Sequence, residues 1–174
     1  MSLLGRVAAG FLSAISCSLQ TSNERANTEV RAIAEVRGKE ISGTFHFVQA
    51  KYTSNTEITG EVKGLYPDKK HGVSIRDGTL EKPDNVYNPF GRKHGGPWNF
   101  ERKVGDLGNI QADKEGVGKY QVSEPYVKLS GPFSVISKVL AVHQNPDDLG
   151  FGKNSESLET GGVGKILAKG TITN

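Results

Sequence analysis

The sequence contains a single cysteine, Cys17, only four histidines, and no apolar run long enough to cross a membrane as a helix. One cysteine excludes any disulfide within the chain, and with it any fold that depends on such cross-links. An excess of charge of one sign is also lacking, because 22 basic residues are balanced by 19 acidic ones and leave a net charge of +3. A mixed surface of this kind argues against a dedicated nucleic-acid-binding protein.

Glycine, by contrast, is abundant, with 22 residues among 174, whereas proline contributes only 7. Many turn-forming residues between short apolar runs favour an all-β protein over a helical one. The length fits one domain that buries its own core. We therefore expect a single β-domain over residues 30–174.

Residues 1–29 do not share the pattern of this domain. They carry one early positive charge at Arg6, then an apolar stretch with small residues, and no acidic residue before Glu24. These features predict a secretory signal peptide over residues 1–18, cleaved near Ser16–Ser18, and an extracellular protein. A mitochondrial presequence and a disordered N-terminal arm of a cytoplasmic protein are the alternatives.

From Val30 onward apolar and polar residues alternate with a period of two, as in a strand with one buried and one wet face. The turn at Gly38-Lys39 makes the first two runs a β-hairpin. The later runs are shorter and are separated by turns, which suits a Greek-key sandwich or flattened barrel. The predicted strands are Val30–Arg37, Ile41–Val48, Glu57–Lys63, His71–Asp77, Lys119–Val122, Tyr126–Leu129, Val135–His143 and Gly164–Thr173.

The most informative stretch is RKHGGPWNFERKVGDLGN, residues 92–109. Its glycines and Pro97 predict a long ordered loop and exclude a regular helix or a central strand. It contains a basic cluster, for which a solvated loop surface is the favoured interpretation and binding of a polyanion the alternative. The cluster comprises Arg92, Lys93, Arg102 and Lys103. Two aromatic residues, Trp98 and Phe100, either pack inside the loop or form a partner surface.

This stretch, together with HQNPDDLGFG at residues 143–152 and LYPDKKHGVSIRDG at residues 65–78, resembles the signature blocks of the copper/zinc superoxide dismutases. The resemblance extends over residues 30–174 and implies an eight-stranded Greek-key β-barrel with two long loops. It also implies superoxide as the substrate and copper and zinc as cofactors. Members of that family usually hold the loop before the zinc site with a disulfide, which a single cysteine cannot form.

The same resemblance assigns the metal positions one by one. It places zinc ligands at His94 and Asp106 and a copper ligand at His143, and these three are retained. The substituted metal positions are Ser74 and Arg76 for copper, Val86 for the histidine that bridges both metals, and Lys103 for zinc. The arginine that guides superoxide falls at Ile166, and the structural positions at His71 and Asp147 are kept.

With most ligands replaced, we expect a non-enzymatic family member that needs no cofactor and acts as a scaffold or binding protein. Its partner would be an unknown protein, an active dismutase subunit, or a second copy in a homodimer, and no membrane is implied. The alternative is a weak dismutase or a carrier of one copper or zinc ion through His94, Asp106, His143 and a neighbour such as His71. We further hypothesise that Arg76 and Lys103 replace the positive charge of the metals beside the retained carboxylates.

Overall fold

The fold is described by a computed structural model that covers residues 29–50 and 55–174. The predicted leader and Cys17 lie outside these residues. No helix in the described part of the chain is long and apolar enough to span a membrane. The elements are β1 (Glu29–Gly38), β2 (Ser42–Ala50), β3 (Thr56–Lys63), β4 (Lys70–Gly78), β5 (Pro83–Val86), β6 (Asp106–Ala112), β7 (Gly118–Glu124), β8 (Val139–His143), α2 (Ser155–Thr160) and β9 (Ile166–Thr171).

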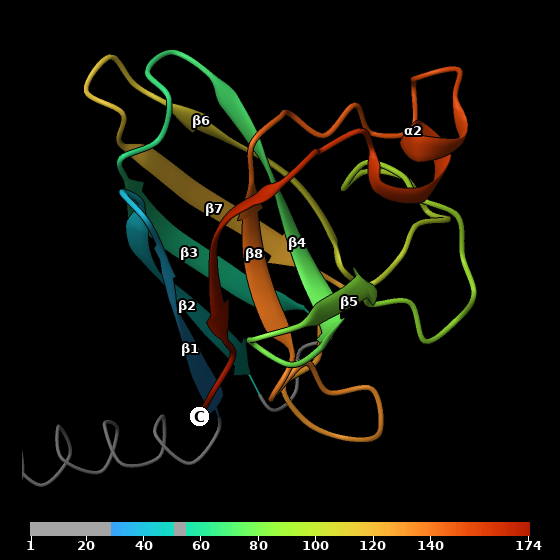
Figure 1. The fold of residues 1–174 in the computed structure, drawn as a ribbon. Coiled ribbons are helices and arrows are strands. Elements are labelled where there is room, and N and C mark those ends of the chain that lie inside the picture. Colours follow the sequence, from blue (N-terminus) through green and yellow to red (C-terminus); the bar gives the residue numbers. More distant parts are fainter. Residues whose placement is uncertain (1–28, 51–54) are drawn as a thin grey trace, which may run out of the picture.

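All strands belong to one antiparallel sheet in the order β5-β4-β6-β7-β3-β2-β1-β9-β8, and pairing of β4 with β8 closes it into a barrel (Figure 1). The links from β3 to β4 and from β7 to β8 join strands that are not neighbours, as in a Greek key. Eight strands close the barrel, and β5 is an extra strand on the β4 edge that β6 also uses. The predicted eight-stranded Greek-key barrel is confirmed.

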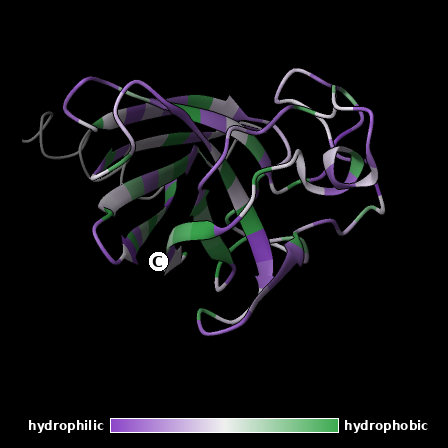
Figure 2. Ribbon diagram, turned by 45° about the horizontal axis from the view of Figure 1, so that its top comes forward, coloured by the Kyte–Doolittle hydropathy of each residue, from purple (hydrophilic) through white to green (hydrophobic). Residues whose placement is uncertain are grey.

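The first three strands form the wall in which the alternation is clearest. Phe45 and Phe47 of β2 and Ile58 of β3 are fully buried, whereas His46 between the two phenylalanines is exposed. Hydrophobic and hydrophilic residues accordingly alternate along these strands (Figure 2). The predicted hairpin is present, because β1 and β2 pair in continuous antiparallel register.

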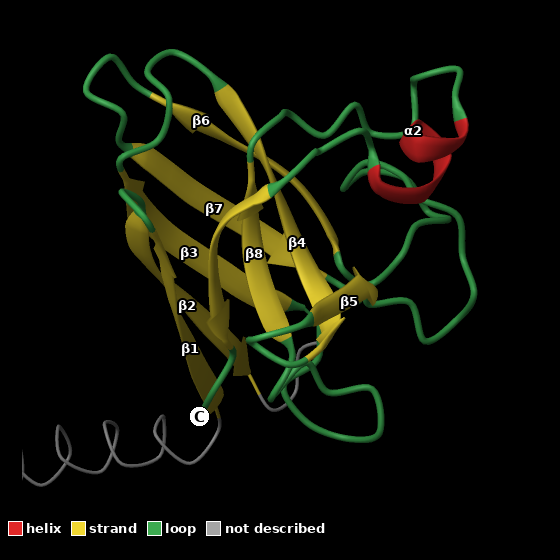
Figure 3. Cartoon of the chain, viewed as in Figure 1, coloured by secondary structure: helices red, strands yellow, loops and turns green. Residues whose placement is uncertain are grey.

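The opposite wall, β4 and β8, is buried on both faces, because long loops and α2 cover its outer side (Figure 3). Val73 and Ile75 of β4 point into the core, so the intervening Ser74 faces outward and is nonetheless buried. A strand that is buried on both faces has no solvent-exposed side chains, and this explains why the run before His143 is continuously apolar.

The predicted strand at Tyr126–Leu129 is wrong, since this segment makes only one isolated bridge, between Lys128 and Ser134. Side chains take the place of a neighbouring strand: Thr56 Oγ1 donates to the Val127 carbonyl at 2.7 Å, and the Gln49 side chain accepts from the Leu129 amide at 2.8 Å. The segment therefore buries its apolar residues without a ladder.

Other boundaries also differ from prediction, and the last strand, β9, covers Ile166–Thr171 instead of Gly164–Thr173. The strand expected from Val135 begins only at Val139, after Ser137 adopts a left-handed backbone with φ of 68°. The loop expected through Asn109 ends at Asp106, because residues 106–109 pair with β4. The structure also contains β5, β6 and α2, which the periodicity did not predict.

Candidate functional site

The site lies outside the barrel, between the outer face of β4 and β8 and two loops, residues 87–105 and 144–165 (Figure 1). The first loop is attached along β4, since the Ile75 amide donates to the Gly105 carbonyl at 3.0 Å and its carbonyl accepts from the Tyr87 amide at 2.9 Å. The second loop approaches Gly72 so closely that a Cβ there would lie 2.6 Å from Val163. Five of the predicted site residues are buried there, namely Ser74, His94, Asp106, His143 and Asp147.

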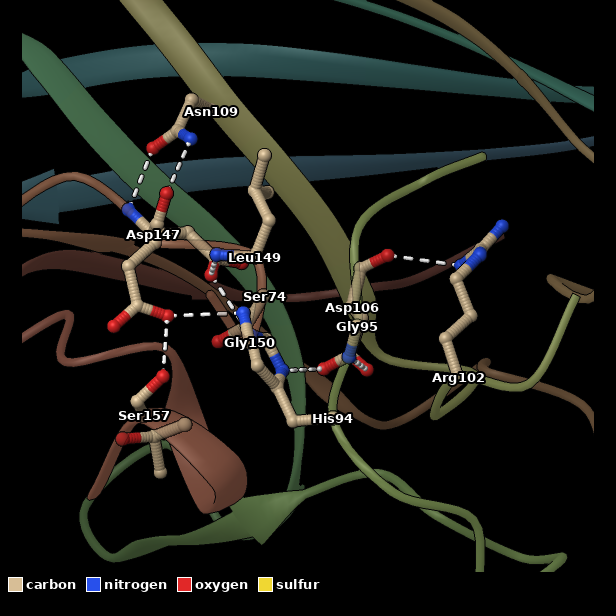
Figure 4. A network of polar contacts seen from close by, with 12 residues as sticks. Ser74, His94, Gly95, Arg102, Asp106, Asn109, Asp147, Leu149, Gly150 and Ser157 are labelled. Atoms are coloured by element: carbon tan, nitrogen blue, oxygen red, sulfur yellow. Dashed lines mark hydrogen bonds and ion pairs between the residues drawn. The ribbon is translucent and has the colours of Figure 1, made fainter. Parts of the chain in front are cut away.

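His94 is the centre of the enclosed network and bridges two carboxylates (Figure 4). Its Nδ1 lies 2.8 Å from Asp106 Oδ1, and its Nε2 lies 2.8 Å from Asp147 Oδ1. All three side chains are at most 4% exposed. One imidazole thus joins the loop before β6 to the loop after β8.

Local backbone geometry fixes both carboxylates. Asp106 Oδ2 accepts hydrogen bonds from the amides of Gly95 and Lys103, at 3.1 and 2.8 Å. The amide of Asp147 donates to the Asn109 side chain at 2.7 Å, and its carbonyl accepts from the same side chain at 2.9 Å. The GDLGN motif therefore supplies one carboxylate directly and orients the other through Asn109.

The carboxylates determine the charge of His94. Burial alone would lower the pKa of His94, but hydrogen bonds to Asp106 and Asp147 and the negative charge of both groups outweigh it and raise the pKa to about 9. His94 is therefore an imidazolium at neutral pH in the metal-free protein, and both of its nitrogens act as donors.

A second histidine cluster lies along β4 and β8. His143 Nε2 is 2.8 Å from Ser74 Oγ, and the His143 carbonyl lies 2.8 Å from Nδ1 of the fully buried His71. Burial and the nearby charge of Arg76 lower the pKa of His143 to about 4, against a weak opposing effect of the Gly164 backbone. His143 is thus neutral, and the His71 ring links β4 to β8 through the His143 carbonyl.

The remaining predicted positions are distributed around these clusters. Val86 is buried on β5, directly opposite Arg76 of β4. The Lys103 ammonium donates to the Glu159 carbonyl at 2.7 Å, and Arg76 Nε donates to the Asp84 carbonyl at 2.8 Å. Burial lowers the pKa of Arg76, which the charge of Asp84 partly opposes.

These contacts correct the charge-replacement hypothesis. In the described part of the chain neither Lys103 nor Arg76 forms an ion pair with a carboxylate, because both side chains donate to backbone carbonyls. The cation beside Asp106 and Asp147 is His94 itself. The hypothesis named the two carboxylates correctly, but it placed the neighbouring positive charge on Arg76 and Lys103 instead of on His94.

The basic cluster is also different from its predicted solvated form, because Arg102 is buried and forms an ion pair with the buried Glu124 of β7. Its NH1 donates to the Asp106 carbonyl at 2.9 Å. Trp98 and Phe100 are 70% and 84% exposed, so they do not pack inside the loop. Nothing in the sequence indicated that Arg102 is buried, because its partner Glu124 lies 22 residues further along the chain, on β7.

One group of described residues has the donor atoms and spacing to hold a metal ion, namely His94, Asp147 and Asp148, whose ligand atoms lie within 4.8 Å of one another. Asp148 was not singled out from the sequence, although it adjoins Asp147 in the motif PDDLG. Its Oδ1 accepts from Ser157 Oγ at 2.8 Å and from the Gly150 amide at 2.9 Å.

Gly161 is expected to be essential to the His94 network. A Cβ at Gly161 would lie 1.9 Å from Asp147 Oδ1 and 2.6 Å from His94 Nε2. We expect Gly161→Ala to lower the pKa of His94 by about one unit or more, since a hydrogen bond to a charged group contributes about 1.5–3 kcal/mol and one pKa unit corresponds to about 1.4 kcal/mol. NMR titration of the His94 ring protons in metal-free protein measures this shift.

Gly162→Ala is the matched control. Gly162 has a similar left-handed backbone, with φ of 67° against 74° for Gly161, but its Cβ would meet only Asp148 Oδ2, at 3.7 Å. Backbone strain is therefore shared by both variants, and the steric contact with His94 is not. Equal pKa shifts in the two variants would show that Gly161 acts through strain alone.

Comparison with known proteins agrees with this architecture. The family model described as copper/zinc superoxide dismutase matches residues 41–172. The chain is 40% identical over 164 residues to a Cu-Zn superoxide dismutase of Paramecium bursaria Chlorella virus 1, covering 91% of this chain and 86% of the relative. It is 40% identical over 153 residues to the Cu-Zn superoxide dismutase of Cryptococcus neoformans, covering 82% and 97%.

A third relative is an extracellular Cu-Zn superoxide dismutase of Onchocerca volvulus, 43% identical over 152 residues, which cover 82% of this chain and 75% of the relative. Similarity of this extent, combined with the closed barrel and its two covering loops, leaves one assignment. The chain belongs to the copper/zinc superoxide dismutase family.

Proposed function

We propose that this chain is a superoxide-dismutase-like protein that lacks copper–zinc catalysis and acts as a scaffold or binding protein. The observation that carries the proposal is the environment of His143. Its Nε2 is already hydrogen-bonded to Ser74, and the charge that acts on its pKa is that of Arg76. Copper that cycles between two oxidation states needs several imidazole ligands, and a guanidinium repels a cation.

The zinc side of the site supports the same proposal. Zinc sites use four ligands, or three and a water, whereas Val86 offers no donor atom and the Lys103 amine is directed to the Glu159 carbonyl. The His94 nitrogens are both engaged by carboxylates. The donor set around Asp106 therefore does not fit a tetrahedral zinc ion.

Metal analysis tests this proposal. After dialysis against copper and zinc and removal of loose metal, we expect far less than one equivalent of either metal per chain by elemental mass spectrometry, and no superoxide dismutation above buffer. The quadruple variant Ser74→His, Arg76→His, Val86→His, Lys103→His is the positive control, and we expect it to retain metal. Stoichiometric copper together with dismutase activity in the unaltered chain would refute the proposal.

A single-metal carrier is the second candidate, favoured by the grouping of His94, Asp147 and Asp148. If the chain is a single-metal carrier, one equivalent of zinc binds per chain and Asp148→Asn abolishes this binding. Glu115→Gln changes an exposed carboxylate outside the group and is the control that leaves zinc binding unchanged. Binding requires displacement of the proton shared by His94 and Asp147, so it would strengthen as the pH rises.

Secretion and a protein partner complete the proposal. An apolar N-terminal stretch supports export, and one relative carries an extracellular name. N-terminal sequencing of protein recovered from the culture medium tests cleavage near Ser16–Ser18.

The proposed partner is a second copy of the chain or an active dismutase subunit. Sedimentation of the chain alone, and mixed with an active copper/zinc superoxide dismutase, distinguishes a homodimer from a mixed pair.

A further inference from the structure

Arg76 lines a cavity that the proposed function does not use. The cavity has a volume of about 460 Å³ and lies between the outer face of β4 and β8 and the second loop. Its floor includes Arg76 and His143, its apolar wall includes Val163 and Ile166, and its rim includes Glu156 and Glu159 of α2. Arg76 is half-buried at this position.

The guanidinium of Arg76 is only partly used by the protein. Nε donates to the Asp84 carbonyl at 2.8 Å, and this is its one hydrogen bond to the described residues. No carboxylate in this part of the chain lies within ion-pair distance of Arg76. Its terminal nitrogens therefore keep their donors free, in the planar fork that suits an oxyanion.

The surroundings increase the effect of this charge. Val163 is buried and Ile166 is half-buried, so this side of the cavity is apolar. Among the described residues that line the cavity, Arg76 is the only lysine or arginine. A charge in a partly desolvated recess acts on an incoming ion more strongly than one in open water. Ile166 is apolar, so it adds neither a charge nor a hydrogen-bond donor beside Arg76.

Glu156 and Glu159 oppose binding of an anion from the rim. Both are exposed, and water and salt therefore screen their charges more than that of Arg76. They are expected to weaken an anion at the floor without preventing its entry. This opposition also provides a direct test, because removal of a rim charge must strengthen binding if the anion lies where the geometry requires.

We propose that Arg76 forms a binding site for a small oxyanion, such as phosphate or a carboxylate, on the floor of this cavity. The terminal nitrogens of Arg76 donate to two oxygens of the anion. The inference rests on the proposed function only in that no copper occupies the space beside His143. Metal-free protein, verified by elemental analysis, is therefore used in the test, so that the two proposals can fail separately.

Calorimetric titration of the full metal-free chain with inorganic phosphate at neutral pH tests the site. We expect saturable binding that Arg76→Gln weakens by about tenfold or more, the equivalent of one charge-assisted hydrogen bond. Arg76→Lys keeps the charge and loses the fork, so we expect an intermediate affinity. Glu159→Gln should strengthen binding about two- to fivefold, as expected for an exposed charge pair.

Arg37→Gln is the matched control, because Arg37 is an exposed arginine on the distant β1, paired with Glu35 at 2.8 Å. It should leave phosphate binding unchanged. Acetate that binds more weakly than phosphate but loses affinity equally in Arg76→Gln would support the shared oxyanion chemistry. Absence of saturable binding, or binding that Arg76→Gln and Glu159→Gln leave unaltered, would overturn the proposal; Glu159→Gln decides the matter even if Arg76→Gln fails to fold.

Discussion

Replacing Glu124 with alanine is expected to lower the free energy of unfolding by about 3–5 kcal/mol, because it leaves the Arg102 guanidinium buried without its counter-charge. Arg102 and Glu124 are each 1% exposed and form an ion pair between the first loop and β7. Arg102 also lies over the Tyr126 ring, with its guanidinium carbon 5.0 Å from the ring centroid. Urea unfolding at neutral pH, followed by circular dichroism, measures the loss.

The double variant Arg102→Met, Glu124→Leu separates burial from pairing. Within the described residues Arg102 Nε and Glu124 Oε1 have no hydrogen-bond partner, so the pair is incompletely satisfied. Apolar side chains of similar size are then expected to recover most of the stability lost in Glu124→Ala. The exposed pair Arg37–Glu35 is the control, and Glu35→Ala should cost less than about 1 kcal/mol. Similar losses in Glu35→Ala and Glu124→Ala would contradict this account.

The metal-free protein should lose stability as the pH rises from about 6.5 to about 9, the ordinary and the folded pKa of His94. The folded state holds the proton more tightly than the unfolded state, so His94 contributes its full stabilisation below the lower pH and none above the higher one. The shift corresponds to about 3 kcal/mol. Denaturant midpoints measured at intervals across this range give the slope.

His94→Gln removes both the charge and its pH dependence. We expect this variant to be less stable than the parent at pH 6 and to lack the alkaline decline, since Asp106 and Asp147 then have no cation between them. The exposed His46→Gln is the matched control and should leave the profile unchanged. A parent profile that is flat between pH 6.5 and 9 would show that His94 is not an imidazolium in the folded protein.

The barrel was predictable where burial is one-sided. Alternation along Val30–Val48 predicts the hairpin, and the structure confirms it in register. Periodicity fails at Val127 and Leu129, which are buried although their backbone bonds to the side chains of Thr56 and Gln49. Alternation reports which side chains are buried, and it does not report whether the backbone partner is another strand.

The site was predictable in its residues and much less so in its contacts. The resemblance identified His94, Asp106 and Asp147, and the structure brings all three together. It could not show that His94 carries the positive charge, because this depends on a carboxylate 53 residues further along the chain. Likewise, the sequence pattern predicts an exposed Arg102, because it does not show that the fold brings Glu124 of β7 next to this side chain.

Closure of the barrel by β4 and β8 leaves β5 as the one strand of the described sheet at an open margin. An open margin offers free amides and carbonyls to other chains and is the usual starting point of strand-to-strand aggregation. β5 is only four residues long, begins with Pro83, and exposes Asp84 and Asn85. A proline, a charge and short length each discourage such pairing, so this molecule is protected against assembly into fibrils at the only margin where the described sheet could recruit a foreign strand.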